Sequence, residues 1–169
     1  MNNTLPVWLP PMVCLEDFAG DSNAYIEHLF SIFKTDFIES SPSYNNKRIL
    51  FDNRMLEQDK PEGFLHIVTE KDNLTGQRTN TDLRRCERLC WIRPVIENFT
   101  DDAIDYWEKE DRGKIKTKFL LRDMDFVVIL SSRKNSCYYL VTSYYLDWPN
   151  SKRKILKERD LYIKQKPPQ

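Results

Sequence analysis

The chain has 169 residues, is 40% hydrophobic and 31% charged, and carries a formal net charge of zero. These values suit one folded domain and argue against a disordered chain, a collagen-like repeat or a coiled coil. No apolar run approaches the roughly 18 residues of a membrane-spanning helix, and the first residues lack the segments of a secretory signal, so we expect a cytoplasmic protein with no membrane partner.

Charge is divided unevenly along the chain. Residues 1–62 hold five Lys/Arg against ten Asp/Glu, whereas residues 63–169 hold 21 against 16. This segregation is typical of a domain with one cationic face, although the acidic part can also be plain solvated surface. The four cysteines form no CxxC pair and there are only two histidines, so we expect reduced thiols, no metal site and no other cofactor.

The N-terminal part predicts a proline-rich arm followed by a helix. "LPVWLPPM" indicates that residues 1–20 form an extended arm whose apolar groups dock on the body. Asp21 or Ser22 can then cap a helix with apolar residues at helical spacing, which Pro42 ends. His28 falls between the apolar positions and is expected on the surface.

The middle of the chain mixes short extended and helical segments. In chain order the sequence predicts strands at 47–51 and 64–69, a polar loop at 70–81, a helix at 82–91 that Pro94 ends, and a short helix at 101–110.

The last third is expected to be a sheet closed by one helix. Segments rich in β-branched and aromatic residues predict strands at 115–121, 125–132 and 136–146, the middle one apolar on both faces and therefore central. A basic helix capped by Asn150 or Ser151 follows, with a frayed tail at 164–169. The predicted class is α+β: residues 21–163 form one domain in which an N-terminal helix packs on a four- or five-stranded, mainly antiparallel sheet with a basic C-terminal helix.

His66 interrupts the apolar run "GFLHIVTE" at 63–70. In a strand, its imidazole is either a hydrogen-bonded group in the core or a proton-transfer group beside a cleft. Burial of an unpaired imidazole costs free energy, whereas an unperturbed pKa near 6.5 suits proton transfer at neutral pH. Both readings stay open on the residues alone.

Arginines cluster in "RRCERLCWIR" at 84–93. Arg84 and Arg88 stand one helical turn apart with Arg85 beside them, and Arg78 and Arg93 bracket the segment. Guanidinium groups bind phosphate through paired hydrogen bonds, so this pattern predicts a phosphate site. A solvated helix face paired with nearby carboxylates explains the same pattern.

Two later segments carry polar groups suited to an anion. In "LVTSYYL", strict alternation places Tyr138, Leu140, Thr142 and Tyr144 on one face, and hydroxyls on both faces indicate that one face is wet, unless the tyrosines simply pack. In "NSKRK", cations at a helix N-terminus oppose the helix dipole, which makes sense if that end receives an anion.

Taken in order, these segments resemble a set of small bacterial and phage proteins assigned to the barnase, EndoU, colicin and RelE-like (BECR) nuclease fold. The similar stretches cover nearly the whole chain: "LPPMVCLEDF", "IFKTDFIESSP", "GFLHIVTE", "DLRRCERLCWIRPVIEN", "DFVVILSSR", "LVTSYYLD" and "KRKILKERD". The resemblance implies an N-terminal helix on an antiparallel sheet, a cleft on the sheet face and metal-independent ribonuclease activity.

Carried over by position, the resemblance implies catalytic roles for His66, Arg84, Arg85, Arg88, Thr142 and Tyr144. It implies RNA binding by Lys154 and Lys157, to which we add the bracketing Arg78 and Arg93. It also implies a toxin of a toxin–antitoxin or phage-conflict system, whose antitoxin partner we would seek at the aromatic arm around Trp8. The alternatives are a non-catalytic RNA- or protein-binding module on the same fold and, from the acidic first 62 residues, an antitoxin or immunity protein.

Overall fold

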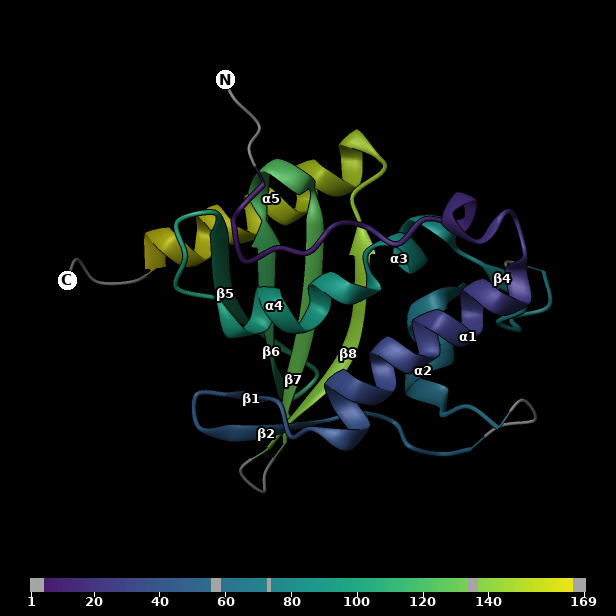
Figure 1. The fold of residues 1–169 in the computed structure, drawn as a ribbon. Helices are drawn as coiled ribbons and strands as arrows, with labels where there is room; N and C mark the ends of the chain where they lie inside the picture. The colour runs from purple at the N-terminus through teal and green to yellow at the C-terminus, as the bar shows by residue number, and fades with distance from the viewer. Residues whose placement is uncertain (1–4, 56–58, 73, 134–136, 166–169) are drawn as a thin grey trace.

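The chain folds into a curled sheet with helices on both faces (Figure 1). The computed structural model describes residues 5–55, 59–72, 74–133 and 137–165. Six strands follow the order β1-β2-β8-β7-β6-β5, and all pairs are antiparallel except β2 with β8. The strands are β1 Ser43–Tyr44, β2 Lys47–Leu50, β5 Ile104–Asp111, β6 Lys114–Leu121, β7 Phe126–Arg133 and β8 Cys137–Tyr145.

The helices are α1 Ser22–Phe33, α2 Glu62–Val68, α3 Leu83–Glu87, α4 Ile92–Glu97 and α5 Pro149–Gln165. A π-helical segment, Lys34–Glu39, extends α1, and short 3-10 turns occupy Leu15–Phe18, Leu89–Trp91 and Arg122–Met124. A second small sheet pairs β3 Thr69–Glu70 with β4 Asn80–Thr81. No helix in the described part of the chain is long and apolar enough to cross a bilayer.

The α+β class, the mainly antiparallel sheet and the C-terminal helix are confirmed. The N-terminal helix differs from the single helix predicted up to Pro42, because α1 ends at Phe33 and a π-helical segment follows it. The predicted number of strands is wrong, because β1 and β2 extend the sheet beyond β8 to six strands. Asp21 caps α1 as expected, with its carboxylate accepting hydrogen bonds from the N–H groups of Asn23 and Ala24. The predicted fraying falls mostly on residues 166–169, which lie outside the described residues.

Two apolar cores flank the sheet. The larger one lies between the sheet and α1 and α4, and it contains Phe33, Trp91 and Phe126. The smaller one lies under α5 and contains Trp107 and Ile155. Because β7 contributes to both cores and lies between β6 and β8, its predicted central position is confirmed.

Three predicted elements are wrong. Residues 64–69 are mainly helical, in α2, because Phe64, Ile67 and Val68 bury one helical face. Pro94 does not end a helix; it lies in the first turn of α4, where a missing N–H costs nothing. Residues 101–110 lie mainly in β5 rather than a helix, because β5 pairs with β6 over eight residues across a tight turn at Arg112–Gly113, both with positive φ.

A bulge in β8 changes which of its side chains share a face. Leu130 pairs with Leu140 and Ile129 with Thr142, so the strict alternation predicted for this strand is broken at Val141. Thr142 and Tyr144 still share a face, but they share it with Tyr139 instead of Tyr138 and Leu140, which point into the larger core. The polar face of β8 is therefore the face toward α5.

The N-terminal arm docks on the body, as predicted, and this docking covers its aromatic residue. The Trp8 indole donates a hydrogen bond to Asp101 and packs against the larger core, while Trp91 donates to the carbonyl of Pro10. Trp8 is therefore half-buried rather than exposed, and binding of a partner at this arm stays a prediction.

Candidate functional site

Helices α2 and α3 lie along β8 and bring side chains onto the face of the sheet toward α5. Among the described residues, two pockets on this face are lined by side chains from these two helices and β8. The first, which we call the His66 pocket, has a volume of about 350 Å³ and is lined by Asp52, Arg54, Glu62, Gly63, His66, Lys114, Lys116, Ser131 and Tyr139–Val141. The second, the Arg85 pocket, has a volume of about 450 Å³ and is lined by Arg85, Lys118, Tyr144, Leu146, Ser151, Lys154, Ile155 and Glu158.

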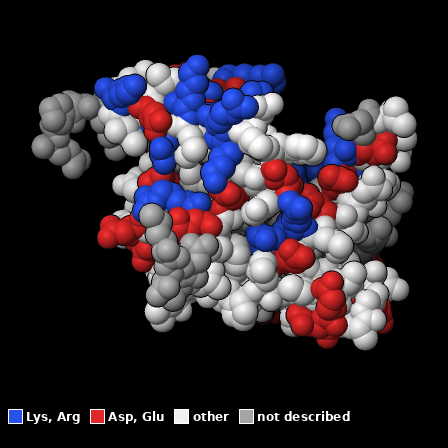
Figure 2. Space-filling model, turned by 90° about the horizontal axis from the view of Figure 1, so that it is seen from above, with Lys and Arg blue, Asp and Glu red and all other residues white. Residues whose placement is uncertain are grey.

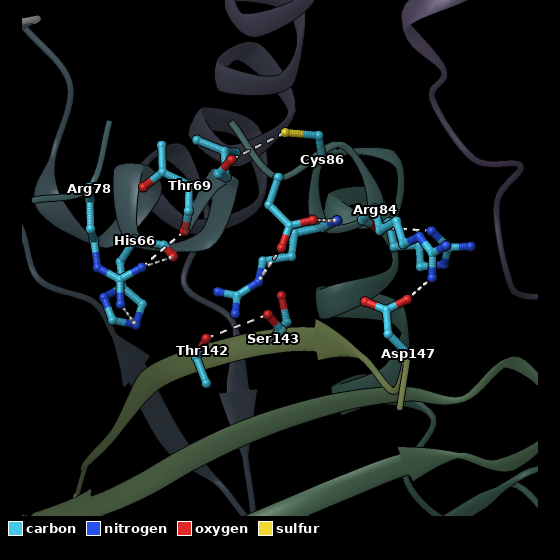
Figure 3. A network of polar contacts seen from close by, with 12 residues as sticks. His66, Thr69, Arg78, Arg84, Cys86, Thr142, Ser143 and Asp147 are labelled. Carbon is cyan, nitrogen blue, oxygen red and sulfur yellow. Dashed lines mark hydrogen bonds and ion pairs between the residues drawn. The ribbon is translucent and has the colours of Figure 1, made fainter. Parts of the chain in front are cut away.

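His66 is half-buried on α2 and lies beside the guanidinium of Arg78 (Figure 3). Arg78 Nη2 is 3.5 Å from His66 Nε2, and Arg78 Nη1 donates to the carbonyl of Thr69 at 2.9 Å. Burial lowers the pKa of the imidazole to about 4, and the positive charges of Arg78 and Arg85 act in the same direction. His66 is therefore neutral at physiological pH, and a pKa this low makes it a weak base there.

Arg85 acts on both pockets. It lines the second pocket, and its charge lowers the pKa of His66 at the first. Its Nε lies 2.9 Å from the carboxylate of Asp82, which also accepts a hydrogen bond from the Arg85 N–H at the start of α3. This ion pair holds the Arg85 side chain against the N-terminal end of the short helix α3.

Tyr144 forms part of the lining of the Arg85 pocket. Burial raises the pKa of its phenol, the nearby Glu158 carboxylate raises it further, and Arg85 opposes both effects. The phenol therefore stays protonated at neutral pH and can donate a hydrogen bond or a proton within this pocket.

Glu158 of α5 holds three donors at the wall of the same pocket. Trp107 Nε1 lies at 2.8 Å, Lys109 Nζ at 2.8 Å and Lys118 Nζ at 2.6 Å from its carboxylate. Burial alone would raise the pKa of this carboxyl, but these hydrogen bonds outweigh it and hold the pKa below its usual range. Glu158 is thus an ionised anchor for two lysines.

The three arginines of α3 and its C-terminal end do not converge on one site. The guanidinium groups of Arg84 and Arg88 lie 5.3 and 4.7 Å from the ring of Tyr145, which points to the opposite face of β8 from Tyr144. Arg84 is ion-paired with Asp147 at the end of the strand, as Figure 3 shows, and Arg88 with Glu87. The expectation that all three arginines hold one phosphate is wrong, since of these three only Arg85 lines either pocket.

The other predicted residues are spread over the molecule. Thr142 lies between the two pocket tyrosines on the same face of β8, and Lys154 joins Arg85 and Tyr144 in one pocket. Lys157 lines a different pocket with Glu108 and Lys109. Arg93 sits on α4, bound to Asp36, Ser40 and Glu97, on the far side of the sheet from the two pockets.

Sequence reasoning missed the lysines of β6. Lys114, Lys116 and Lys118 alternate in "KIKTK", and Lys116 and Lys118 have Ser131 and Ile129 as cross-strand neighbours on the pocket face. Alternate residues of a strand lie on one face, so the spacing of these lysines could have predicted a row of positive charges on the sheet. On the surface seen in Figure 2, basic side chains also gather over α5, with acidic side chains among them. The positive charge is therefore confined to patches and does not cover a whole face of the molecule.

The described residues contain neither a cluster of metal-binding side chains nor a thiol with a lowered pKa. Among them, no group of three or more His, Cys, Asp or Glu side chains could hold a metal ion. All four cysteines are free, as expected, and burial raises the pKa of the Cys86 thiol to about 12, so that thiol stays protonated and inert.

No family model, curated protein or solved structure matches this chain. The arrangement of the two pockets therefore carries the functional argument.

Proposed function

We propose that the protein is a metal-independent endoribonuclease that uses the RNA's own 2′-hydroxyl as nucleophile. The observation that carries the proposal is the placement of an imidazole (His66), a guanidinium (Arg85) and a phenol (Tyr144) in two pockets on one open face of the sheet. A base, an acid and a fixed cation are the groups that this reaction needs.

In the proposed reaction His66 acts as the general base. It takes the proton of the 2′-OH while the 2′-oxygen bonds to phosphorus, and the bond from phosphorus to the 5′-oxygen breaks. Tyr144 supplies the proton to that leaving oxygen, and Arg85 stabilises the charge on the phosphate. Lys154, Arg78 and Thr142 position the strand, and the products are a 2′,3′-cyclic phosphate and a 5′-hydroxyl.

The resemblance to BECR nucleases supports the same assignment and adds a biological role. It favours a cytoplasmic toxin with RNA as substrate and an antitoxin as partner. Because Trp8 is held by Asp101, an antitoxin is better placed over the two pockets, where it would block the reaction directly.

The test is cleavage of total RNA in the presence of EDTA. Wild type is expected to cleave, His66→Ala to lose most activity, and His28→Ala to match wild type because His28 is exposed on α1. Equal cleavage by wild type and His66→Ala, or no cleavage by either, would count against the proposal.

A second candidate is a binding module on the same fold without catalysis. Ion pairs inside the His66 pocket favour it, since Arg54 is paired with Asp52 and Lys116 with Asp111, which leaves less free positive charge for a scissile phosphate. This candidate predicts salt-dependent RNA binding without cleavage. Growth inhibition on expression that His66→Ala relieves would exclude it.

A further inference from the structure

The lysines of β6 connect the two pockets across the sheet. Lys116, Ser131 and Tyr139 are cross-strand neighbours, and Lys118, Ile129 and Thr142 form the next row on the same face. Lys116 lines the His66 pocket and Lys118 the Arg85 pocket. Two residues of a strand span about 7 Å, which is of the order of the separation of neighbouring phosphates in an extended nucleic-acid strand.

Each pocket repeats one combination of groups. The His66 pocket holds Lys116 and Tyr139, and the Arg85 pocket holds Lys118 and Tyr144. All four residues are partly exposed, although the Lys118 side chain is only 13% exposed and Tyr144 also packs against the smaller core. An ammonium group next to a tyrosine ring matches one phosphate next to one base, because unpaired bases stack on aromatic side chains.

Both pockets are lined by more cationic than acidic side chains. The Arg85 pocket carries Arg85, Lys118 and Lys154 against the single carboxylate of Glu158. The His66 pocket carries Arg54, Lys114 and Lys116 against Asp52 and Glu62. Because Lys116 is ion-paired with Asp111 and Lys118 with Glu158, a phosphate has to share these lysines with their carboxylates or displace the carboxylates.

We propose that this face binds one single-stranded RNA segment across both pockets, with Lys116 and Lys118 as ligands of successive phosphates and Tyr139 and Tyr144 as stacking surfaces. The identity of the ligand as RNA rests on the proposed function. A single strand is required because paired bases are not free to stack on the two tyrosines. An acidic peptide has negative charges for the lysines, but it has no flat bases that could stack on the rings of Tyr139 and Tyr144.

Lys109 provides a matched control for Lys118. Both lysines bind the Glu158 carboxylate, at 2.8 and 2.6 Å, so either substitution removes one ion pair from the same anchor. Lys109 lines the neighbouring pocket with Lys157, which shares Lys154 and Glu158 with the Arg85 pocket, and its side chain is 52% exposed against 13% for Lys118. If Lys118 acts only by holding Glu158, Lys109→Gln and Lys118→Gln should have similar effects on binding.

The experiment measures binding of a 2′-O-methyl RNA oligonucleotide, which has no free 2′-OH and cannot be cleaved by the proposed reaction. Fluorescence anisotropy is recorded against salt for the single strand, for its duplex, and in competition with polyglutamate. Wild type is expected to bind the single strand best. Lys116→Gln and Lys118→Gln should each weaken binding by about five- to tenfold and reduce the slope of log affinity against log salt by about 0.7.

Several results would overturn the inference. These are the same affinity for Lys109→Gln and Lys118→Gln, equal binding of duplex and single strand, full competition by polyglutamate, or no binding by wild type. Because the probe is not cleaved, the result is separate from the cleavage assay in EDTA. Binding with these lysine effects but no cleavage of natural RNA would uphold this inference and reject the nuclease proposal.

Discussion

Replacing His66 by glutamine is expected to make the free energy of unfolding less sensitive to pH between about 6.5 and 4. The pKa of His66 is lowered from 6.5 to about 4 in the folded chain, so the unfolded state takes up a proton first as the pH falls. The neutral imidazole therefore contributes its full stability above about pH 6.5 and loses it on the way down to pH 4.

The size of this effect follows from the pKa values. At about 1.4 kcal/mol for each unit of pKa, the difference between 6.5 and about 4 corresponds to roughly 3 kcal/mol. Because the imidazole is only half-buried, solvent screens part of this, and we expect about 1.5 kcal/mol.

Urea unfolding at about pH 7 and about pH 4 measures the difference. Wild type should lose about 1.5 kcal/mol more than His66→Gln over this range, while carboxylates that titrate in both proteins cancel. His28→Gln, which replaces the exposed histidine, should behave as wild type. An identical pH dependence for wild type and His66→Gln would refute the buried, neutral imidazole.

Three further predictions concern other parts of the chain. Asp21→Ala should lower the free energy of unfolding by about 1 kcal/mol in urea titrations through loss of the α1 cap, and Ser22→Ala should change it little. Phe33→Ala should cost about 3–5 kcal/mol in the same assay, because this ring is fully buried in the larger core. Arg85→Gln should raise the pKa of His66 in an NMR titration and lower RNA cleavage by about 100-fold, with unchanged circular dichroism; a lowered pKa would contradict the assigned geometry.

The elements with strong periodic patterns were predictable from the sequence. The helix after Asp21, the three late strands and the basic last helix have long, consistent patterns of apolar residues. Helix α2 was not, because a seven-residue apolar run fits a buried strand as well as a buried helix. Strand β5 was missed because its charged sequence becomes a strand through pairing with β6, a contact made across the turn at Arg112–Gly113.

The residue types of the candidate site could be predicted from the sequence, but which of these residues lie together could not. Residue types identified His66, Arg85 and Tyr144, yet only tertiary packing shows that Arg84 and Arg88 turn to the other face of β8. The pKa of His66 depends on burial and on Arg78, which lies 12 residues away in the chain. Such shifts have no local sequence signature.

The central claim, that the face of β8 cleaves RNA through its 2′-OH, is tested most directly with a DNA oligonucleotide that contains one ribonucleotide. Incubated with wild type in EDTA, it should be cut only after the ribonucleotide, leaving a 2′,3′-cyclic phosphate that mass spectrometry identifies, and His66→Ala should leave it intact. Cutting at deoxynucleotides, or the same cyclic phosphate yield from His66→Ala, would contradict the account.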